Sequence, residues 1–478
     1  MMQLICRETA YVYDAYHILR AFFPEEEVNQ KIETEQEPLI SVEAESGSYF
    51  RCDSDKTSIR IFDKGAFRQK KDIILQFYQE LVEETGRELP WGILTGVRPT
   101  KLLMGRARQG DTPEEMIRWF RGNYRVSEEK ATLGTEIVER EREILQPLDL
   151  ENGYSLYAGI PFCPSICAYC SFSSSPIELW KDRTEAYLEA LSKELLFLAE
   201  ACKDKVLNTV YIGGGTPTTL TADQLDRLLT LLEERFAYGK VLEVTVEAGR
   251  PDSITEEKLL ALKRHHVTRI SINPQTMQQK TLDRVGRRHT VEDVRKAFRL
   301  ARKLDFDNIN MDLIAGLPGE GIPEMQDTLA QIEALEPDSL TVHALAVKRA
   351  AFYGQNPVKT ASVGEMEGMI ESVQASAERM GLHPYYLYRQ KNMVGNFENV
   401  GYAKVDKAGI YNILIMEEIQ TILAAGAGSS TKIVLPKPVR KADGKMTNLI
   451  RIENVKNVQE YMERIDEMTN RKGKWLWH

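Results

Sequence analysis

Three cysteines lie close together near the middle of the chain, at positions 163, 167 and 170, with the spacing C-x3-C-x2-C. Cysteine thiolates are the usual ligands of iron–sulfur clusters. Because a four-iron cube offers four irons, three thiolates leave one iron open for an organic ligand. Apolar residues flank the loop and an aromatic residue precedes the last cysteine, so the sulfurs are expected to be partly shielded from water.

A zinc site is the main alternative, because zinc is also bound by closely spaced cysteines. Structural zinc sites need four ligands, usually from two such pairs. The remaining cysteines, Cys6, Cys52 and Cys202, are scattered singly along the chain. A disulfide framework is also not expected, because a chain of 478 residues with six cysteines has no need of it. The spacing therefore favours a cluster.

The composition is that of an ordinary globular protein, with 42% hydrophobic and 28% charged residues. Its 71 acidic and 62 basic residues give a net charge of −9, which argues against a general nucleic-acid surface. We find no signal-peptide pattern and no apolar run of membrane-spanning length. The most apolar stretch, 413–427, contains Glu417, Glu418 and Gln420, and is predicted to be an amphipathic helix. We expect a cytoplasmic protein without a membrane span or a nucleic-acid partner.

Residues 150–350 alternate short β-branched runs with amphipathic helical patterns. Such units predict a parallel sheet with helical crossovers. Six units are two short of a closed barrel, so the predicted fold class is α/β, a partial (β/α)6 barrel. The expected strands are 155–159, 209–212, 242–247, 268–272, 308–314 and 340–343.

The chain divides into four expected regions. Residues 1–124 are an N-terminal α/β module, with helices at 11–23 and 69–84 and strands at 39–45 and 58–62. A helical linker covers 125–150, and the partial barrel covers 151–355. The last region, 356–478, is expected to be mainly helical and to cover the substrate.

The ends of the expected strands carry groups suited to ligand binding. One strand runs into Gly213-Gly214-Gly215-Thr216-Pro217, and consecutive glycines let the backbone approach a ligand closely. The next strand ends at Glu247, whose carboxylate could bind ribose hydroxyls. Because active sites in such barrels lie at the carboxyl ends of the strands, these groups are expected to share one rim.

This series of motifs resembles the radical S-adenosylmethionine superfamily, and within it the oxygen-independent coproporphyrinogen III oxidase (coproporphyrinogen dehydrogenase) group. The stretch 385–396, with Gly426-Ala427-Gly428, is similar to the branch that has an extra N-terminal domain. The matching motifs begin at Tyr157, Cys163, Gly213, Glu247, Arg269, Gly286 and Asn310.

The resemblance implies that Cys163, Cys167 and Cys170 hold a [4Fe–4S] cluster and that S-adenosylmethionine chelates the open iron. It also implies which residues contact S-adenosylmethionine, in one or two molecules. The first molecule would meet Tyr157, Tyr169, Gly214, Gly215, Thr216 and Glu247, and a second would meet Gln275, Arg287, Asp312 and Ala346.

The implied reaction belongs to heme (porphyrin) biosynthesis. An electron from a low-potential donor such as flavodoxin or ferredoxin cleaves S-adenosylmethionine to a 5′-deoxyadenosyl radical, which takes a hydrogen from a propionate side chain. Loss of carbon dioxide and one electron leaves a vinyl group, and two rounds convert coproporphyrinogen III to protoporphyrinogen IX. The tetrapyrrole carries four carboxylates, which basic side chains would bind. Candidates are Lys348, Arg349, Arg389 and Lys391, with Arg98 as a further one.

Two departures from the group keep other functions open. Gly159 stands where the group has a histidine, and Phe172 stands where the oxidases have a further cysteine. The second feature is shared with the heme-chaperone branch, but residues 394–399 lack that branch's histidine and tryptophan, which leaves His343 and His383 as possible heme ligands. A heme-binding chaperone-like protein and a radical enzyme acting on another tetrapyrrole, such as heme, are the alternatives, since fold does not fix substrate.

Overall fold

The computed structural model describes residues 1–24, 26–35, 38–45, 56–62, 69–348, 350–356, 358–390, 397–441, 444 and 446–476. The chain forms two compact units, Met1–Glu139 with Leu387–Glu398, and Arg140–Tyr386 with Asn399–His478. The division falls inside helix α5 (Glu128–Leu145), within the region expected to be a linker. None of the helices in these described ranges is long and apolar enough to cross a membrane.

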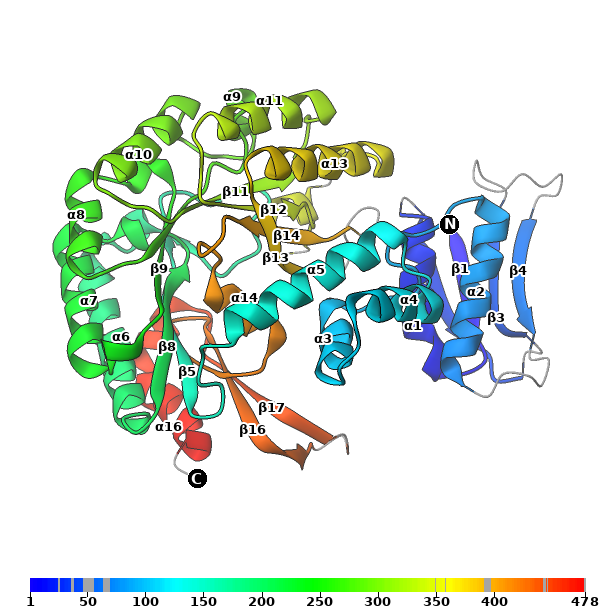
Figure 1. The fold of residues 1–478 in the computed structure, drawn as a ribbon, viewed down its shortest axis with the longest axis horizontal. Coiled ribbons are helices and arrows are strands. Elements are labelled where there is room, and N and C mark those ends of the chain that lie inside the picture. Colours follow the sequence, from blue (N-terminus) through cyan, green and yellow to red (C-terminus); the bar gives the residue numbers. More distant parts are fainter. Residues whose placement is uncertain are drawn as a thin grey trace. The chain divides into compact units, whose positions relative to one another are not determined.

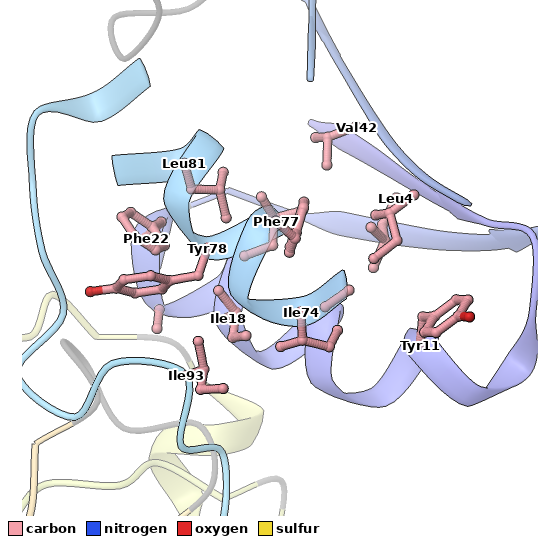
Figure 2. Packing of buried hydrophobic residues seen from close by; sticks show 14 of the residues in the cluster. Leu4, Tyr11, Ile18, Phe22, Val42, Ile74, Phe77, Tyr78, Leu81 and Ile93 are labelled. Carbon is pink, nitrogen blue, oxygen red and sulfur yellow. The ribbon is translucent and has the colours of Figure 1, made fainter. Parts of the chain in front are cut away.

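The N-terminal unit contains a mixed sheet in the strand order β2-β1-β3-β4. Strand β1 pairs in parallel with β2 and antiparallel with β3. Leu4 of β1, Ile18 of α1 and Phe77 of α2 meet in the core of this unit (Figure 2). The elements are β1 (Met2–Cys6), α1 (Thr9–Phe22), β2 (Val28–Ile32), β3 (Pro38–Glu45), β4 (Lys56–Phe62), α2 (Lys70–Thr85), α3 (Thr100–Arg108) and α4 (Pro113–Tyr124).

The second unit is built on parallel strands that lie side by side in chain order, with helices on their outer side (Figure 1). This arrangement confirms the predicted partial barrel. The strands are β5 (Gly153–Ile160), β8 (Val206–Gly214), β9 (Glu243–Gly249), β10 (Arg269–Ile272), β11 (Ile309–Ala315) and β12 (Ser339–Ala344). The helices are α6 (Thr184–Ala201), α7 (Ala222–Arg235), α8 (Glu256–Arg264), α10 (Val291–Lys303) and α11 (Ile322–Glu333).

The C-terminal region contains more strand than the sequence predicted. Strand β14 pairs antiparallel with β12 at one edge of the barrel sheet, and β15 pairs in parallel with β5 at the other edge. The region comprises α13 (Val363–Arg379), β13 (His383–Tyr388), β14 (Asn399–Ala403), α14 (Ile410–Glu417), β15 (Thr421–Ala425), β16 (Ser430–Arg440), β17 (Met446–Glu453), α15 (Val458–Glu463) and α16 (Ile465–Leu476).

The predicted helix over 413–427 is wrong in its second half. Helix α14 ends at Glu417, and Glu418 adopts a left-handed conformation with φ of 51°. The residues that follow form strand β15, whose backbone is hydrogen-bonded to β5 on one side and to β16 on the other. Tertiary pairing therefore overrides the local helical pattern.

Candidate functional site

The three cysteines lie on a loop that follows β5 and begins at the short strand β6 (Phe162–Cys163). The end of β8 holds this loop through two backbone hydrogen bonds, from Gly215 N to Ile160 O and from Thr216 N to Phe162 O, both 2.7 Å. A Cβ atom at Gly215 would stand 2.5 Å from Phe162 O and 3.0 Å from Cys163 Sγ. Only glycine therefore lets the strand approach the cysteine loop so closely.

Two of the sulfurs are largely buried and have hydrogen-bond donors beside them. Burial raises the pKa of Cys163, while the hydrogen bond from the Thr216 hydroxyl to its sulfur acts in the opposite direction. Burial likewise raises the pKa of Cys170, and the backbone N–H of Phe172 opposes it. Donors aimed at a sulfur stabilise the deprotonated form, which is the form that binds iron. These residues therefore fit a cluster.

The described residues do not offer a site for a single metal ion. Within the described parts of the chain, no three histidine, cysteine, aspartate or glutamate side chains converge on one ion. A cluster distributes its thiolates over several irons, so its ligands need not converge on one point.

Arg250 fixes the cysteine loop from outside the motif. Its Nη1 donates to the backbone oxygen of Ser165 at 3.1 Å and to the Ser165 hydroxyl at 2.6 Å. Arg250 is itself buried and paired with Asp252, with 2.7 Å between Nη2 and Oδ2. Arg250 was not predicted as a site residue, although it follows Glu247 by three residues. Its position directly after strand β9, at the carboxyl end of a barrel strand, could have indicated a role at the site.

The segment after β10 holds the other side of the cysteine loop. Ala168 N donates to Val285 O at 3.0 Å, and the Ser165 hydroxyl donates to Gly286 O at 2.9 Å. The predicted Gly286-Arg287 motif thus contacts the loop through its backbone as well as through the Arg287 side chain.

Glu247 and Tyr211 form a hydrogen-bonded pair inside the barrel. The Tyr211 hydroxyl on β8 donates to Glu247 Oε1 on β9 at 2.5 Å. Burial raises the pKa of Glu247 to about 7, and the hydrogen bond from Tyr211 limits the rise. A Cβ at Gly213 would stand 3.0 Å from the Glu247 carboxyl carbon, so the first glycine of the triplet makes room for this carboxylate. Tyr211 was not predicted as a site residue.

Tyr211 also belongs to a triangular cluster of three nearly parallel tyrosine rings. Its ring centroid lies 4.5 Å from that of Tyr411 and 6.1 Å from that of Tyr157. Tyr411 comes from α14, whose first N–H groups donate to the buried carboxylate of Glu243. The C-terminal region thus contributes a ring to the barrel interior.

Three residues expected to contact S-adenosylmethionine form one hydrogen-bonded group. Arg287 Nη1 donates to the Tyr169 hydroxyl at 3.1 Å, and that hydroxyl donates to Gln275 Oε1 at 3.4 Å. Gln275 has a left-handed backbone, with φ of 69°, and its N–H donates to Asp312 O at 2.9 Å. Ala346 follows strand β12 and is half-buried.

The predicted substrate-binding cations are dispersed. Lys348 is exposed, and its Nζ lies 6.0 Å from the centre of the Phe172 ring. Arg389 belongs to the N-terminal unit, where it is buried, donates to Leu94 O at 2.8 Å and lies over the Trp91 ring. The Arg389 guanidinium therefore makes its contacts inside that unit. Arg349 and Lys391 lie outside the described residues.

The two histidines considered as heme ligands lie in different surroundings. His343 on β12 is half-buried, its Nε2 is 4.0 Å from Asp312 Oδ2, and burial lowers its pKa. His383 is exposed at the start of β13. Of the segment compared with the heme-chaperone branch, residues 394–396 lie outside the described residues, and Glu398 is buried and accepts a hydrogen bond from Trp91.

A partial barrel with a three-cysteine loop and a glycine-rich strand end is typical of one class of proteins, the radical S-adenosylmethionine proteins. The family model of the Radical SAM superfamily matches residues 157–332. The fold of this superfamily implies that the chain binds a [4Fe–4S] cluster and S-adenosylmethionine as cofactors. It also indicates an enzyme.

Within that class, the chain belongs to the family of coproporphyrinogen III oxidase-like proteins. It is 42% identical over 421 residues to the oxygen-independent coproporphyrinogen-III oxidase-like protein HemZ of Bacillus subtilis, covering 87% of this chain and 82% of that protein. The heme chaperone HemW of Bacillus subtilis is 34% identical over 236 residues, which cover 48% of this chain and 62% of the chaperone. The structure of coproporphyrinogen III oxidase (HemN) from Escherichia coli matches with a TM-score of 0.55 at 22% identity, over 69% of this chain and 73% of that one.

Proposed function

We propose that this chain catalyses the anaerobic oxidative decarboxylation of coproporphyrinogen III to protoporphyrinogen IX. The observation that carries the proposal is the joint placement of the cysteine loop, Gly215 and Glu247 at the carboxyl ends of adjacent strands. The similarity to HemZ, a coproporphyrinogen-III oxidase-like protein, supports a tetrapyrrole as the class of substrate.

In this proposal Cys163, Cys167 and Cys170 bind the cluster. Bound together, the cluster and S-adenosylmethionine supply a one-electron reductive cleavage that permits hydrogen abstraction from carbon. The chain's own part is to hold and shield these groups. Glu247 accepts hydrogen bonds from the ribose, and Tyr211 orients its carboxylate.

The remaining predicted contacts divide into two sets. Tyr157, Tyr169, Gly214, Gly215 and Thr216 surround the first S-adenosylmethionine. A second molecule would lie near the group formed by Gln275, Arg287 and Asp312, with Ala346 beside it. The electron comes from a low-potential donor such as flavodoxin or ferredoxin.

The test is an anoxic assay of the reconstituted protein with coproporphyrinogen III, S-adenosylmethionine and a reductant. We expect 5′-deoxyadenosine and vinyl products to appear together. Cys167→Ala should lose both, together with the cluster absorbance and about four irons per chain. Cys202→Ala, which lies away from the loop, is the matched control and should retain them.

The second candidate function is heme binding of the chaperone type, which the 34% identity to HemW favours. It predicts stoichiometric binding of heme and no deoxyadenosine coupled to coproporphyrinogen III. Deoxyadenosine formed with heme as the substrate would instead indicate a radical enzyme acting on another tetrapyrrole.

A further inference from the structure

Three ionisable side chains that have no assigned ligand lie together beside the cysteine loop: Arg250, Asp252 and His289. Arg250 Nε donates to Asp252 Oδ1 at 3.0 Å, and Arg250 Nη2 donates to Asp252 Oδ2 at 2.7 Å. His289 Nδ1 lies 3.8 Å from the same Oδ1. Arg250 and His289 are buried, whereas the Asp252 side chain keeps 22% of its surface exposed. Two parallel hydrogen bonds of this kind fix the plane of the guanidinium.

Arg250 is held at both its backbone and its side chain. The Ser253 hydroxyl donates to Arg250 O at 2.8 Å. At the other end, the guanidinium bridges Asp252 and Ser165. Ser165 lies between Cys163 and Cys167 in the sequence, so the guanidinium sits against the part of the loop that joins two of the sulfurs. Its charge therefore has a fixed place beside the cluster ligands.

Asp252 is the counter-charge of Arg250. Burial acts to raise the pKa of Asp252, but the hydrogen bonds and the charge of Arg250 outweigh burial and hold that pKa below its usual value. Burial lowers the pKa of His289 to about 4, so its imidazole is neutral at neutral pH. The group therefore contains one cation and one partly exposed anion, and His289 adds no charge.

The charge of Arg250 acts on a sulfur that the side chain does not contact. Burial raises the pKa of Cys163, and the positive charge of Arg250 counters that rise. A charge that favours the Cys163 thiolate also favours additional negative charge on a cluster bound to it, because both effects are Coulombic attraction in a poorly solvated place.

We propose that Arg250 is a positioning residue that also sets the reduction potential of the cluster: its fixed positive charge beside the cysteine loop stabilises the reduced form, and the charge of Asp252 limits this effect. Reduction transfers one electron from a low-potential donor to the cluster and adds one negative charge, so nearby charges shift the potential. This inference goes beyond the proposed function, because it concerns the cluster and holds for any substrate.

A purely structural role makes a different prediction. If Arg250 only held the loop in place, replacing either Arg250 or Asp252 would loosen the same contacts. The two replacements would then change the potential in the same direction or leave it unchanged. A role of charge requires opposite directions, because one replacement removes a cation and the other removes an anion.

The measurement is a dithionite titration of the anoxically reconstituted full chain without S-adenosylmethionine, followed by electron paramagnetic resonance. We expect Arg250→Met to lower the potential, with a fall of about tenfold in the equilibrium constant of reduction, which is about 59 mV for one electron. Asp252→Asn should raise that constant about threefold, a smaller effect because water screens the partly exposed carboxylate. Arg250→Lys keeps the charge but loses the forked contact, so its potential should lie closer to the wild type than that of Arg250→Met.

Arg264→Met and Asp226→Asn are the matched controls. Arg264 and Asp226 form an exposed ion pair, with 2.6 Å between Nη2 and Oδ1. Helix α8 leads from the end of β9 back to the start of β10, so Arg264, its last residue, lies at the opposite end of the barrel from the cysteine loop. Both controls should keep the wild-type potential. Iron content, measured for every variant, normalises the signal.

Three results would overturn the proposal. One is a shift of the same sign in Arg250→Met and Asp252→Asn. Another is a potential in Arg250→Lys equal to that of Arg250→Met. The third is a shift in the control variants as large as that in Arg250→Met, which would make net charge rather than position the cause. If Arg250→Met does not retain the cluster, Asp252→Asn decides, and an unchanged or lower potential in that variant overturns the proposal.

Discussion

The ammonium of Lys472 on α16 and the carboxylate of Glu194 on α6 form an ion pair in which neither side chain is exposed to solvent. Glu194 also accepts hydrogen bonds from the Tyr461 hydroxyl at 2.6 Å and from Gly426 N at 2.9 Å. Lys472 in turn donates to Asn454 Oδ1 at 2.8 Å. This buried network ties the C-terminal helices to the turn at Gly426 and Gly428, which lies against Ser173 at the end of the cysteine loop.

The network predicts a strong effect of Lys472→Met on stability. Removing one partner leaves the Glu194 charge buried without its cation, which costs about 3–5 kcal/mol of unfolding free energy. Denaturant unfolding of the anoxic protein measures this loss. Lys193→Met is the control, because Lys193 pairs with Asp466 between the same helices in an exposed position. The control should change stability little, and an equal loss in both variants would contradict the prediction.

Glu247→Gln should alter how stability depends on pH. Burial favours the neutral carboxyl, and the folded-state pKa of about 7 exceeds the ordinary value of 4.5. The wild type therefore loses stability as pH rises from 4.5 to 7, whereas the glutamine variant does not. We expect the variant of the cofactor-free protein to be more stable by about 3 kcal/mol at pH 8 and to show no such advantage at pH 4.5.

Urea unfolding at several pH values measures this difference. Glu234→Gln on the exposed face of α7 is the control and should follow the wild type at every pH. A constant difference between Glu247→Gln and the wild type across the range would mean that the carboxyl does not titrate there.

Tyr211→Phe should shift the pH dependence of S-adenosylmethionine binding. In the wild type, the hydrogen bond from the Tyr211 hydroxyl lowers the pKa of Glu247. Removing this hydroxyl raises that pKa, so the carboxylate forms only at higher pH. We expect affinity to rise with pH in both proteins, with the midpoint of the variant at higher pH, when measured by titration calorimetry. Tyr238→Phe is the control, since the Tyr238 hydroxyl has no hydrogen-bond partner among the described residues. A uniform loss of affinity at all pH values would indicate a purely steric role for Tyr211.

Gly215→Ala should prevent the cysteine loop from packing on β8. The added methyl would stand 2.5 Å from Phe162 O, a backbone atom that has little freedom to move. We expect the reconstituted variant to hold less than half of the wild-type iron. Gly239→Ala is the control, because nothing lies within 4 Å of a Cβ at that position. Full iron content in Gly215→Ala would show that the loop can retreat from the strand.

The parts of the site that could be predicted are those carried by short continuous motifs. The cysteine triad, the glycine triplet and Glu247 each lie within a few residues of a strand end, and a parallel barrel brings its strand ends to one rim. The strands themselves were predictable because their buried residues form short apolar runs. The second half of the helix predicted for 413–427 was wrong because β15 is stabilised by its neighbours β5 and β16 rather than by its own pattern.

The sequence by itself determined the chemistry of this protein: which thiols could bind iron, and on which strands the accompanying polar groups are placed. Only the tertiary structure decided what surrounds them. Arg250 donates hydrogen bonds to Ser165, Tyr411 stacks on Tyr211, and Ala168 bonds to Val285, although these partners are distant in the sequence. The physical reason is that bonding within a motif depends on local spacing, whereas burial, hydrogen bonding and charge at the site depend on which remote segments pack together.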